Sequence, residues 1–337
     1  MKKLLRYLTV LAIAIVIAVY GIFFWKNSVE PTSQGKEVII MIPKGSTLSS
    51  ITDTLANYDL IRSTLTFRSA AKLLGASSKI QAGSYRIQFG LSNTEIISRL
   101  TGTAYAILFE ITFPEGSHIR RIASIAKEKL RIDSAQFVAL ARDTAFIHSL
   151  GIPRDAKTAE GYLFPETYRF YVSVTAKDLF KKMVAEWKER VPDSLIKRAK
   201  SLGLTTHKFM TLASIVEAEA QRADERDTVA GVYWNRLKIG MKLDADPTVQ
   251  YGLSLDRPIT SRELHKENPY NTYINKDLPP GPINNPGIAA IKATLNYAKH
   301  DKIFFVAKRD GSGGHYFART MAEQERNIRR SNQNEGR

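Results

Sequence analysis

Apolar and polar positions change their pattern several times along the chain, and each change predicts a different kind of element. Residues 7–25 carry no charge and are mostly Leu, Ile, Val and Ala. About 20 such residues cross the hydrocarbon core of a bilayer as a helix. Residues 26–36 are polar, contain turn formers and show no apolar period. We therefore expect a membrane helix followed by a linker.

Basic residues near this helix predict its orientation. Lys2, Lys3 and Arg6 precede the helix, and only Lys26 follows it closely. By the positive-inside tendency, residues 1–6 lie in the cytoplasm and the rest of the chain lies outside. A cleaved signal peptide is the alternative, but its apolar region would be shorter and followed by small residues. The predicted localisation is the inner (cytoplasmic) membrane, single-pass, with the folded part in the periplasm.

Strand and helix patterns alternate after the linker. A strand-like run at residues 38–42 leads into a turn at residues 43–46 and a short helix. The same order recurs 71 residues later, where Pro114 occupies the place of Pro43. A strand, a turn, short helices and a closing strand outline a LysM-like module, a type that grips aminosugar polymers. We expect residues 37–150 to be a LysM-like region with a duplicated strand–turn–helix unit, the alternative being small α+β packing units that bind nothing.

The next part of the chain is dominated by helical periodicity. Apolar residues at i, i+3 and i+4 predict helices at residues 176–190, 193–202, 206–220 and 225–237. Beyond them, six of the 13 prolines lie between Pro258 and Pro286, a density that holds loops rigid. The expected fold class is α+β, with a transmembrane helix, the LysM-like α/β module, a mainly helical catalytic domain with small β elements and proline-rich cleft loops at residues 151–330, and a tail at residues 331–337.

Composition narrows the classes of partner and chemistry. The chain has 49 basic and 33 acidic residues, a net charge of +16 that suits a polyanion, an anionic membrane or an acidic wall polymer. A domain outside the cytoplasm does not meet nucleic acid, and no basic run is interleaved with aromatics, so we expect no nucleic-acid partner. The absence of cysteine excludes disulfides and thiolate chemistry. The six histidines are too scattered for a metal site, so we expect no metal and no cofactor.

A candidate general acid lies in the third predicted helix. Residues 212–220 set Glu217 and Glu219 in an apolar run. Desolvation raises the pKa of a carboxyl, which then holds a proton near neutral pH and delivers it to a leaving group. The helical wheel does not select Glu217, since Glu219 lies no farther from the apolar centre than Glu217 does. Side chains at i and i+2 of a helix point to different sides, so Glu217 and Glu219 are not the two carboxyls that an ordinary glycosidase places across the scissile bond. The alternative is that Glu217 and Glu219 have no catalytic role and lie at the border of the apolar face of an amphipathic helix.

Polar phrases after the helices supply groups suited to sugars. Tyr rings stack on sugar rings, and Asn and Thr side chains bind hydroxyl and acetamido groups. Glu160 and Glu166 are weaker candidates for contact with the substrate. If the enzyme hydrolysed the glycosidic bond, Asp246 would be the second acid. The alternative is a set of ordered surface loops. The expected substrate-binding residues are Asn235, Asp246, Thr248, Gln250, Tyr251, Tyr270, Asn271, Thr272, Tyr273, Asn285 and His315.

Eight phrases follow one another in the second half of the chain. They are Ala213-Ser214-Ile215-Val216-Glu217, Arg226-Asp227 with Val229-Ala230, Asn235-Arg236-Leu237, Ile239-Gly240-Met241, Asp246-Pro247-Thr248-Val249, Tyr270-Asn271-Thr272-Tyr273, Leu278-Pro279-Pro280-Gly281, and Gly313-Gly314-His315 with Phe317. This ordered set closely resembles the endolytic murein transglycosylase family (MltG, also called YceG-like). The resemblance covers the whole chain, because that family also has a membrane anchor, a LysM-like region and a catalytic domain.

The resemblance implies a lyase that cleaves the β-1,4 bond between N-acetylmuramic acid and N-acetylglucosamine in nascent peptidoglycan strands and so terminates their elongation. It places the family's catalytic acid on Glu217. That residue would protonate the glycosidic oxygen and then take the proton of the muramic acid C6 hydroxyl as a 1,6-anhydro end forms. The implied partners are glycan strands, the inner membrane and peptidoglycan synthases. The alternative function is a non-catalytic, membrane-anchored peptidoglycan-binding scaffold for those synthases.

Overall fold

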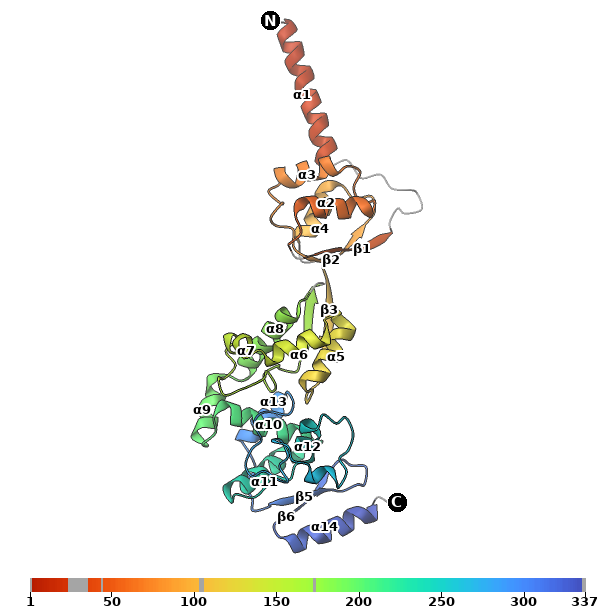
Figure 1. Cartoon of the computed structure of the whole chain (residues 1–337). Helices are drawn as coiled ribbons and strands as arrows, with labels where there is room; N and C mark the ends of the chain where they lie inside the picture. The colour runs from red at the N-terminus through yellow and green to blue at the C-terminus, as the bar shows by residue number, and fades with distance from the viewer. Residues whose placement is uncertain (1, 24–35, 44, 103–105, 172–173, 335–337) are drawn as a thin grey trace. The chain divides into compact units, whose positions relative to one another are not determined.

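The fold divides into two compact units. The computed structural model describes residues 2–23, 36–43, 45–102, 106–171 and 174–334 (Figure 1). Unit 1 comprises Met1–Ile111 and Tyr168–Val174, and unit 2 comprises Thr112–Thr167 and Thr175–Arg337. The packing boundary thus falls at Ile111. The functional boundary that the sequence suggests, between residues 150 and 151, is a different division and stays a prediction.

The first helix, α1 (Lys2–Phe23), has the length and composition of a membrane helix. Among the described residues it is the one helix that meets both conditions, with a mean hydropathy of 2.1 over Arg6–Phe23 and none of that window buried. A helix of 22 residues is about 33 Å long, close to the thickness of a hydrocarbon core. The predicted helix is therefore present through Phe23. Its expected end at residues 24–25 and most of the linker, residues 26–35, lie outside the described residues.

The rest of unit 1 is a small layer of helices on a sheet. The strands lie in the order β1-β2-β3-β4, with β1–β2 and β2–β3 antiparallel. Ile40 and Ile42 of β1 are buried whereas Ile39 and Met41 are exposed, the two-residue period of a half-buried strand. The elements are β1 (Glu37–Ile42), α2 (Leu48–Asn57), α3 (Thr64–Leu73), β2 (Gly83–Gln88), α4 (Asn93–Thr101), β3 (Ala106–Thr112) and β4 (Thr167–Tyr171). The mixed α and β character is confirmed, and the LysM-like identity stays a prediction.

Unit 2 is mainly helical. Its elements are α5 (Ile119–Leu130), α6 (Ser134–Arg142), α7 (Thr144–Ser149), α8 (Ala176–Arg190), α9 (Asp193–Ser201), α10 (Thr206–Glu219), η3 (Ala223–Glu225), α11 (Arg226–Lys238), α12 (Asp246–Gly252), η4 (Glu263–His265), α13 (Ile288–Leu295), β5 (Phe304–Ala307), β6 (His315–Ala318) and α14 (Met321–Asn334). The four helices predicted from periodicity are confirmed, each end within one residue. Between Pro258 and Pro286 the described structure has one short helix, η4, and α12 and α13 lie on either side of this part in the sequence. Pro247 stands in the first turn of α12, where its missing N–H costs nothing.

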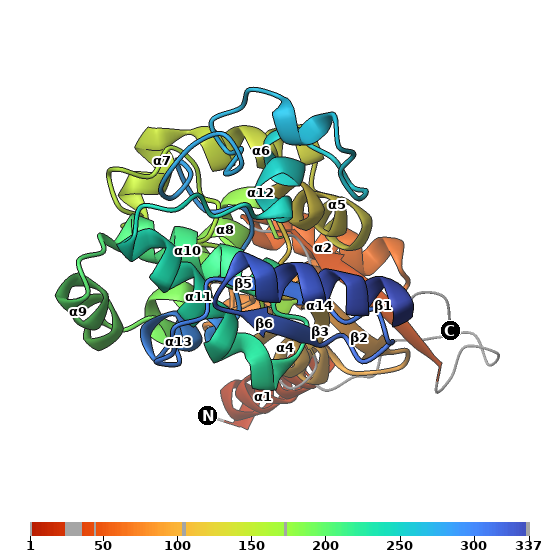
Figure 2. The same cartoon turned by 90° about the horizontal axis from the view of Figure 1, so that it is seen from below.

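Helix α10 forms the centre of unit 2. It packs against α9, α11, α12 and α13, and the views of Figures 1 and 2 agree on this arrangement. Between His207 and Val216 every residue except Lys208 is buried. A helix buried on all sides has no single apolar stripe. Its last turn, with Glu217 and Glu219, is partly exposed.

A hairpin and a helix complete unit 2. Strands β5 and β6 pair antiparallel with Phe304 opposite Ala318 and are among the small β elements expected in this domain. Helix α14 packs along both strands, as Figure 2 shows in dark blue. The side chain of Gln324 donates to the carbonyl of Phe305 at 2.9 Å, and the hydroxyl of Ser331 donates to that of Ala307 at 2.7 Å. These bonds tie the helix to the edge strand β5.

Candidate active site around Glu217

Glu217 combines partial exposure with an environment that favours its protonated form. Its Oε2 accepts a hydrogen bond from the backbone N–H of Gly287 at 3.1 Å. Burial raises the pKa of Glu217, the Gly287 bond opposes this, the negative charge of Glu115 raises the pKa further, and Arg226 lowers it. The C-terminal end of a helix also disfavours a negative charge. A carboxyl that reaches solvent and keeps its proton to a higher pH than usual is suited to general acid catalysis.

Residues 280–287 run along α10 and carry Gly287 to the carboxyl of Glu217. The carbonyl of Pro280 accepts a hydrogen bond from the Nε2–H of His207. The Nδ1 of the same ring then accepts a hydrogen bond from the hydroxyl of Tyr162. The segment is therefore held to α10 at three places: Pro280 to His207 at 2.9 Å, Asn284 to the Ser214 carbonyl at 2.9 Å, and Gly287 to Glu217.

The turn at residues 114–117 lies against Glu217 from another direction. The Ser117 N–H donates to the Pro114 carbonyl at 3.2 Å, and Gly116 has a φ of +72°, the geometry of a type II turn. The N–H of Gly116 donates to the Asn285 carbonyl at 3.0 Å. A Cβ added to Gly116 would lie 3.7 Å from Cγ of Glu217. In the sequence this turn is recognisable only as part of a repeat, and no local signal marks its place beside Glu217.

Glu160 is a buried carboxyl behind this turn. It is 2% exposed, and both its oxygens accept the N–H of Ile119, at 3.0 and 3.1 Å. Nδ2 of Asn285 donates to it at 2.9 Å and also to the Ser117 carbonyl at 2.9 Å. Burial raises the pKa of Glu160 to about 7 despite these bonds. The carboxyl thus joins the start of α5 to the segment that carries Gly287.

Glu219 belongs to a separate group of side chains. Burial, followed by the charge of Asp246, raises its pKa to about 7, so the expectation that burial raises the pKa of a Glu in this run holds for Glu217 and Glu219 alike. The hydroxyl of Tyr273 donates to Oδ1 of Asp246 at 2.5 Å. The charge of Asp246 therefore raises the pKa of Glu219, whereas the charge that raises the pKa of Glu217 is that of Glu115.

Tyr251 and Tyr270 form a third group. Their ring centroids are 4.9 Å apart, and the guanidinium of Arg120 lies 5.9 Å from the Tyr251 ring centroid. The Tyr251 hydroxyl bonds to Glu160, and burial raises the pKa of Tyr251 above its ordinary value. Of the expected substrate-binding residues, these two tyrosines and Asn285 are thus brought to Glu160, and Asp246 and Tyr273 to Glu219.

The other expected substrate-binding residues have partners within the protein. Their polar groups hold loops in place, and a role in binding substrate stays a prediction. Asn235 donates to the carbonyls of His300 and Lys302, Gln250 to that of Arg257, and Asn271 to those of Leu264 and Lys266; Thr248 donates to Ala245 and contacts Thr272, and His315 pairs with Glu225. The weaker candidate Glu166 pairs with Arg190 at 3.0 Å.

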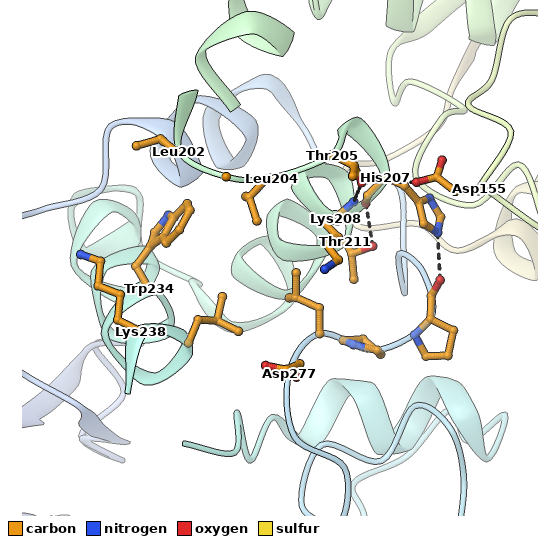
Figure 3. A pocket seen from close by; sticks show the side chains of 15 residues that line it. Asp155, Leu202, Leu204, Thr205, His207, Lys208, Thr211, Trp234, Lys238 and Asp277 are labelled. Atoms are coloured by element: carbon orange, nitrogen blue, oxygen red, sulfur yellow. Dashed lines mark hydrogen bonds between the residues drawn. The ribbon is translucent and has the colours of Figure 1, made fainter. Parts of the chain in front are cut away.

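A pocket of about 650 Å³ lies at the N-terminal end of α10, the end away from Glu217 (Figure 3). Lys208, Trp234 and Asp277 are among the residues that line it. Nine residues of helix, about 14 Å, separate Lys208 from Glu217. The indole N–H of Trp234 donates to the Thr294 carbonyl at 2.8 Å. The pocket is therefore distinct from the carboxylates around Glu217. Among the described residues, no group of three His, Asp or Glu side chains is placed to hold a metal ion.

Comparisons with known proteins agree with one another. The sequence profile of the YceG-like family matches residues 40–330. A Bacillus subtilis protein named endolytic murein transglycosylase is 35% identical over 321 residues, which cover 90% of this chain and 88% of that protein. A Streptococcus pneumoniae protein of the same name is 28% identical over 356 residues, and the match spans 96% of this chain but 64% of the relative. The crystal structure of a YceG-like protein from Listeria monocytogenes has a TM-score of 0.60 and 28% identity, covering 87% of this chain and 99% of that one.

Proposed function

Because the chain belongs to the YceG-like family, we propose that it is a membrane-anchored, endolytic peptidoglycan lytic transglycosylase. The relatives named endolytic murein transglycosylase support the substrate and the type of reaction. The observation that carries the proposal is the partly exposed carboxyl of Glu217, whose pKa burial raises. The enzyme cleaves the β-1,4 bond between N-acetylmuramic acid and N-acetylglucosamine in nascent strands, and the product carries a 1,6-anhydro end.

One carboxyl performs both proton transfers in this mechanism. Oε2 of Glu217 accepts the Gly287 N–H, so Oε1 carries the transferable proton. That proton goes to the glycosidic oxygen as the bond from this oxygen to C1 of muramic acid breaks. The carboxylate left behind is stabilised by the Gly287 N–H. It then takes the proton of the C6 hydroxyl while the C6 oxygen bonds to C1. The nucleophile belongs to the substrate, and its high effective concentration replaces an activated water.

Digestion of purified glycan strands tests the reaction. Wild-type protein is expected to release muramic acid ends lighter than hydrolysed ends by one water, with no solvent oxygen incorporated from heavy-oxygen water. Glu217→Gln should lower the rate by about 10²- to 10⁴-fold, the contribution of a general acid, with an unchanged circular dichroism spectrum. Glu219→Gln is the matched control on the same helical turn and should keep most of the activity. Ends that carry solvent oxygen would show hydrolysis instead, and absence of any cleavage by wild-type protein would leave the non-catalytic scaffold as the explanation.

The order in which fragments appear tests the endolytic part. The proline-rich segment at residues 278–287 and the residues 270–273 would line a groove open at both ends, which allows internal cuts. Early digests should then contain long fragments. Disaccharides released first from one terminus would contradict endolytic cleavage even if every end were anhydro.

The anchor is proposed to hold the enzyme where new strands emerge. The length and apolar composition of α1 support this, since a tether raises the local concentration of the tethered domain. Protein lacking residues 1–26 should be active on isolated strands and should fail to restore strand length in cells. Full restoration by the truncated protein, exported at the native level, would show that the segment only directs export. The LysM-like region is proposed to bind glycan, which a strand-binding assay on unit 1 variants would test.

A further inference from the structure

Gly287 lies against the carboxylates of two residues that are far apart in sequence. Its N–H donates to Glu217. A Cβ added to Gly287 would overlap the carboxylate of Glu115, so this carboxylate occupies the space that a side chain at position 287 would fill. At the φ of −74° of Gly287, its N–H and its Cβ direction point to the same side of the backbone, so the two carboxylates lie on the same side of this glycine. The side chain of Glu115 is exposed to solvent, and that of Glu217 is partly exposed.

The backbone that carries Glu115 is held firmly. The turn on which it lies is bonded to Asn285 by three hydrogen bonds, from the Gly116 N–H at 3.0 Å, from the Asn285 N–H to Ser117 at 3.1 Å and from Asn285 Nδ2 to Ser117 at 2.9 Å. The left-handed φ of Gly116 fixes the direction of the turn. The fixed backbone keeps the Glu115 side chain within reach of Gly287, and a charge positioned before the reaction is what an electrostatic role in catalysis requires.

We propose that Glu115 is the second carboxylate of the site, and that its negative charge faces the sugar ring from beside Gly287, on the same side as Glu217. The inference rests on the proposed function and adds a residue that the single-acid mechanism does not contain. Asp246, the second acid that the sequence suggests for a hydrolytic variant, acts on Glu219 instead.

The first consequence concerns the proton on Glu217. Two charged side chains act on this carboxyl among the described residues, Glu115 from the turn before α5 and Arg226 from the first position of α11. After burial and the Gly287 bond, the charge of Glu115 raises the pKa of Glu217 and that of Arg226 lowers it. Glu115 thus helps Glu217 to keep the proton that it delivers to the glycosidic oxygen.

The second consequence concerns the charge that develops on the substrate. When the bond between C1 and the glycosidic oxygen breaks, positive charge spreads over C1 and the ring oxygen. A carboxylate already fixed nearby stabilises that charge without reorganising. Glu115 forms no bond to the sugar and exchanges no proton. The C6 oxygen closes on C1, and its proton returns to Glu217, so the bonds and protons of the proposed reaction balance without Glu115.

The test compares two substitutions with opposite expected signs. The rate falls at high pH as Glu217 loses its proton, so the alkaline limb of kcat/KM reports the pKa of that carboxyl. Glu115→Gln should move the limb to lower pH by about 0.3 to 1 unit, the effect of one partly exposed charge. Arg226→Gln should move it to higher pH. Glu115→Gln should also lower kcat by about 10- to 100-fold at the optimum, because the charge facing the sugar is lost.

A third variant displaces Glu115 without removing it. Gly287 has a φ of −74° and a ψ of 166°, which alanine adopts without strain, and its N–H remains available to Glu217. In Gly287→Ala the new methyl group pushes the Glu115 carboxylate away, since that is the end of a flexible side chain. The alkaline limb should then shift in the same direction as in Glu115→Gln. In the double variant the two shifts should not add, because both substitutions remove one interaction.

Matched controls separate charge from structure. Glu115→Asp keeps the charge and should keep the limb closer to the wild-type position than Glu115→Gln does. Glu325→Gln removes a charge from an exposed site on α14 and should leave the limb unmoved. Equal shifts in Glu115→Gln and Arg226→Gln, or an unshifted limb in Glu115→Gln, would overturn the role of Glu115. Wild-type protein without anhydro products would instead overturn the proposed function, so the two failures are distinguishable.

Discussion

The segment with Pro43, Gly45 and Ser46 and the turn at residues 114–117 share two local features. In each, the serine N–H donates to the proline carbonyl at 3.2 Å, and the glycine is left-handed, with φ of +84° at Gly45 and +72° at Gly116. Each turn leads into a helix whose capping residue, Thr47 for α2 and His118 for α5, accepts a backbone N–H three residues on. The repeated sequence thus produces the repeated shape.

Their surroundings differ completely. A side chain at Gly45 would meet nothing within 4 Å, whereas one at Gly116 would contact Glu217. The hydroxyl of Ser46 turns back to its own Pro43 carbonyl at 2.8 Å. The second turn is instead bonded to Asn285, which comes from the far end of the chain. Local sequence is therefore enough to make the turn, and only a distant partner makes it part of a site.

Removing that partner should give the largest effect. Asn285→Ala leaves the buried Leu163 N–H and the Glu160 carboxyl short of a bond, so we expect a loss of about 2 to 4 kcal/mol in the free energy of unfolding of unit 2. Ser46→Ala, which removes an exposed bond in the first turn, should cost less than about 0.5 kcal/mol. Hydrogen exchange resolved by unit measures both. Similar losses for the two variants would contradict the importance of the distant partner.

The buried Glu160 should give the second turn a pH dependence. Its folded pKa of about 7 lies above the ordinary 4.5, so the folded state holds a proton that the unfolded state has released. Stability therefore falls as pH rises from about 4.5 to 7, by up to about 3 kcal/mol for this group. In Glu160→Gln the slope of stability against pH should become shallower, and denaturant unfolding at pH 5 and pH 8 measures it. A slope equal to that of wild-type protein would rule this contribution out.

Alanine at the two turn glycines should separate stability from activity. Gly45→Ala and Gly116→Ala both force alanine into the left-handed region, at a similar cost of about 1 to 2 kcal/mol. Only Gly116→Ala should also reduce glycan cleavage, because that turn contacts Glu217 and carries Glu115. Thermal unfolding and digestion assays on both variants supply the measurement. An equal loss of activity in Gly45→Ala would mean that the activity simply follows stability.

The helix caps should give the smallest effect. Thr47→Ala and His118→Ala each remove one capping bond, at about 1 kcal/mol. Burial, assisted by Arg120, lowers the pKa of His118 from 6.5, so the folded state binds fewer protons than the unfolded one. The stability of the wild-type α5 cap should therefore fall as pH drops below about 6.5, and the cost of His118→Ala should shrink there. The cost of Thr47→Ala should not depend on pH, as unfolding at pH 5 and 7.5 would reveal.

Much of the architecture follows from the sequence alone. The apolar helix, the strand at residues 38–42 and the four helices predicted between residues 176 and 237 all have local periodicity, and local periodicity decides which face of an element is buried. The resemblance selected Glu217 from the phrase that contains it. Residue types alone did not select Glu217 over Glu219, because α10 is buried on nearly every side and the distance from an apolar centre says little about function there.

The neighbours of each carboxyl were decided by the tertiary structure. Glu115 and Gly287 meet Glu217 across more than 60 residues of chain on either side, and no local pattern marks that meeting. The polar residues expected to bind sugar, such as Asn235 and Asn271, satisfy loop carbonyls instead, since buried backbone groups need partners wherever a loop is compact. The sequence by itself determined which segments are helices and which carboxyls enter an apolar run. Which charges lie beside those carboxyls depends on long-range packing, because electrostatic effects act through space and not along the chain.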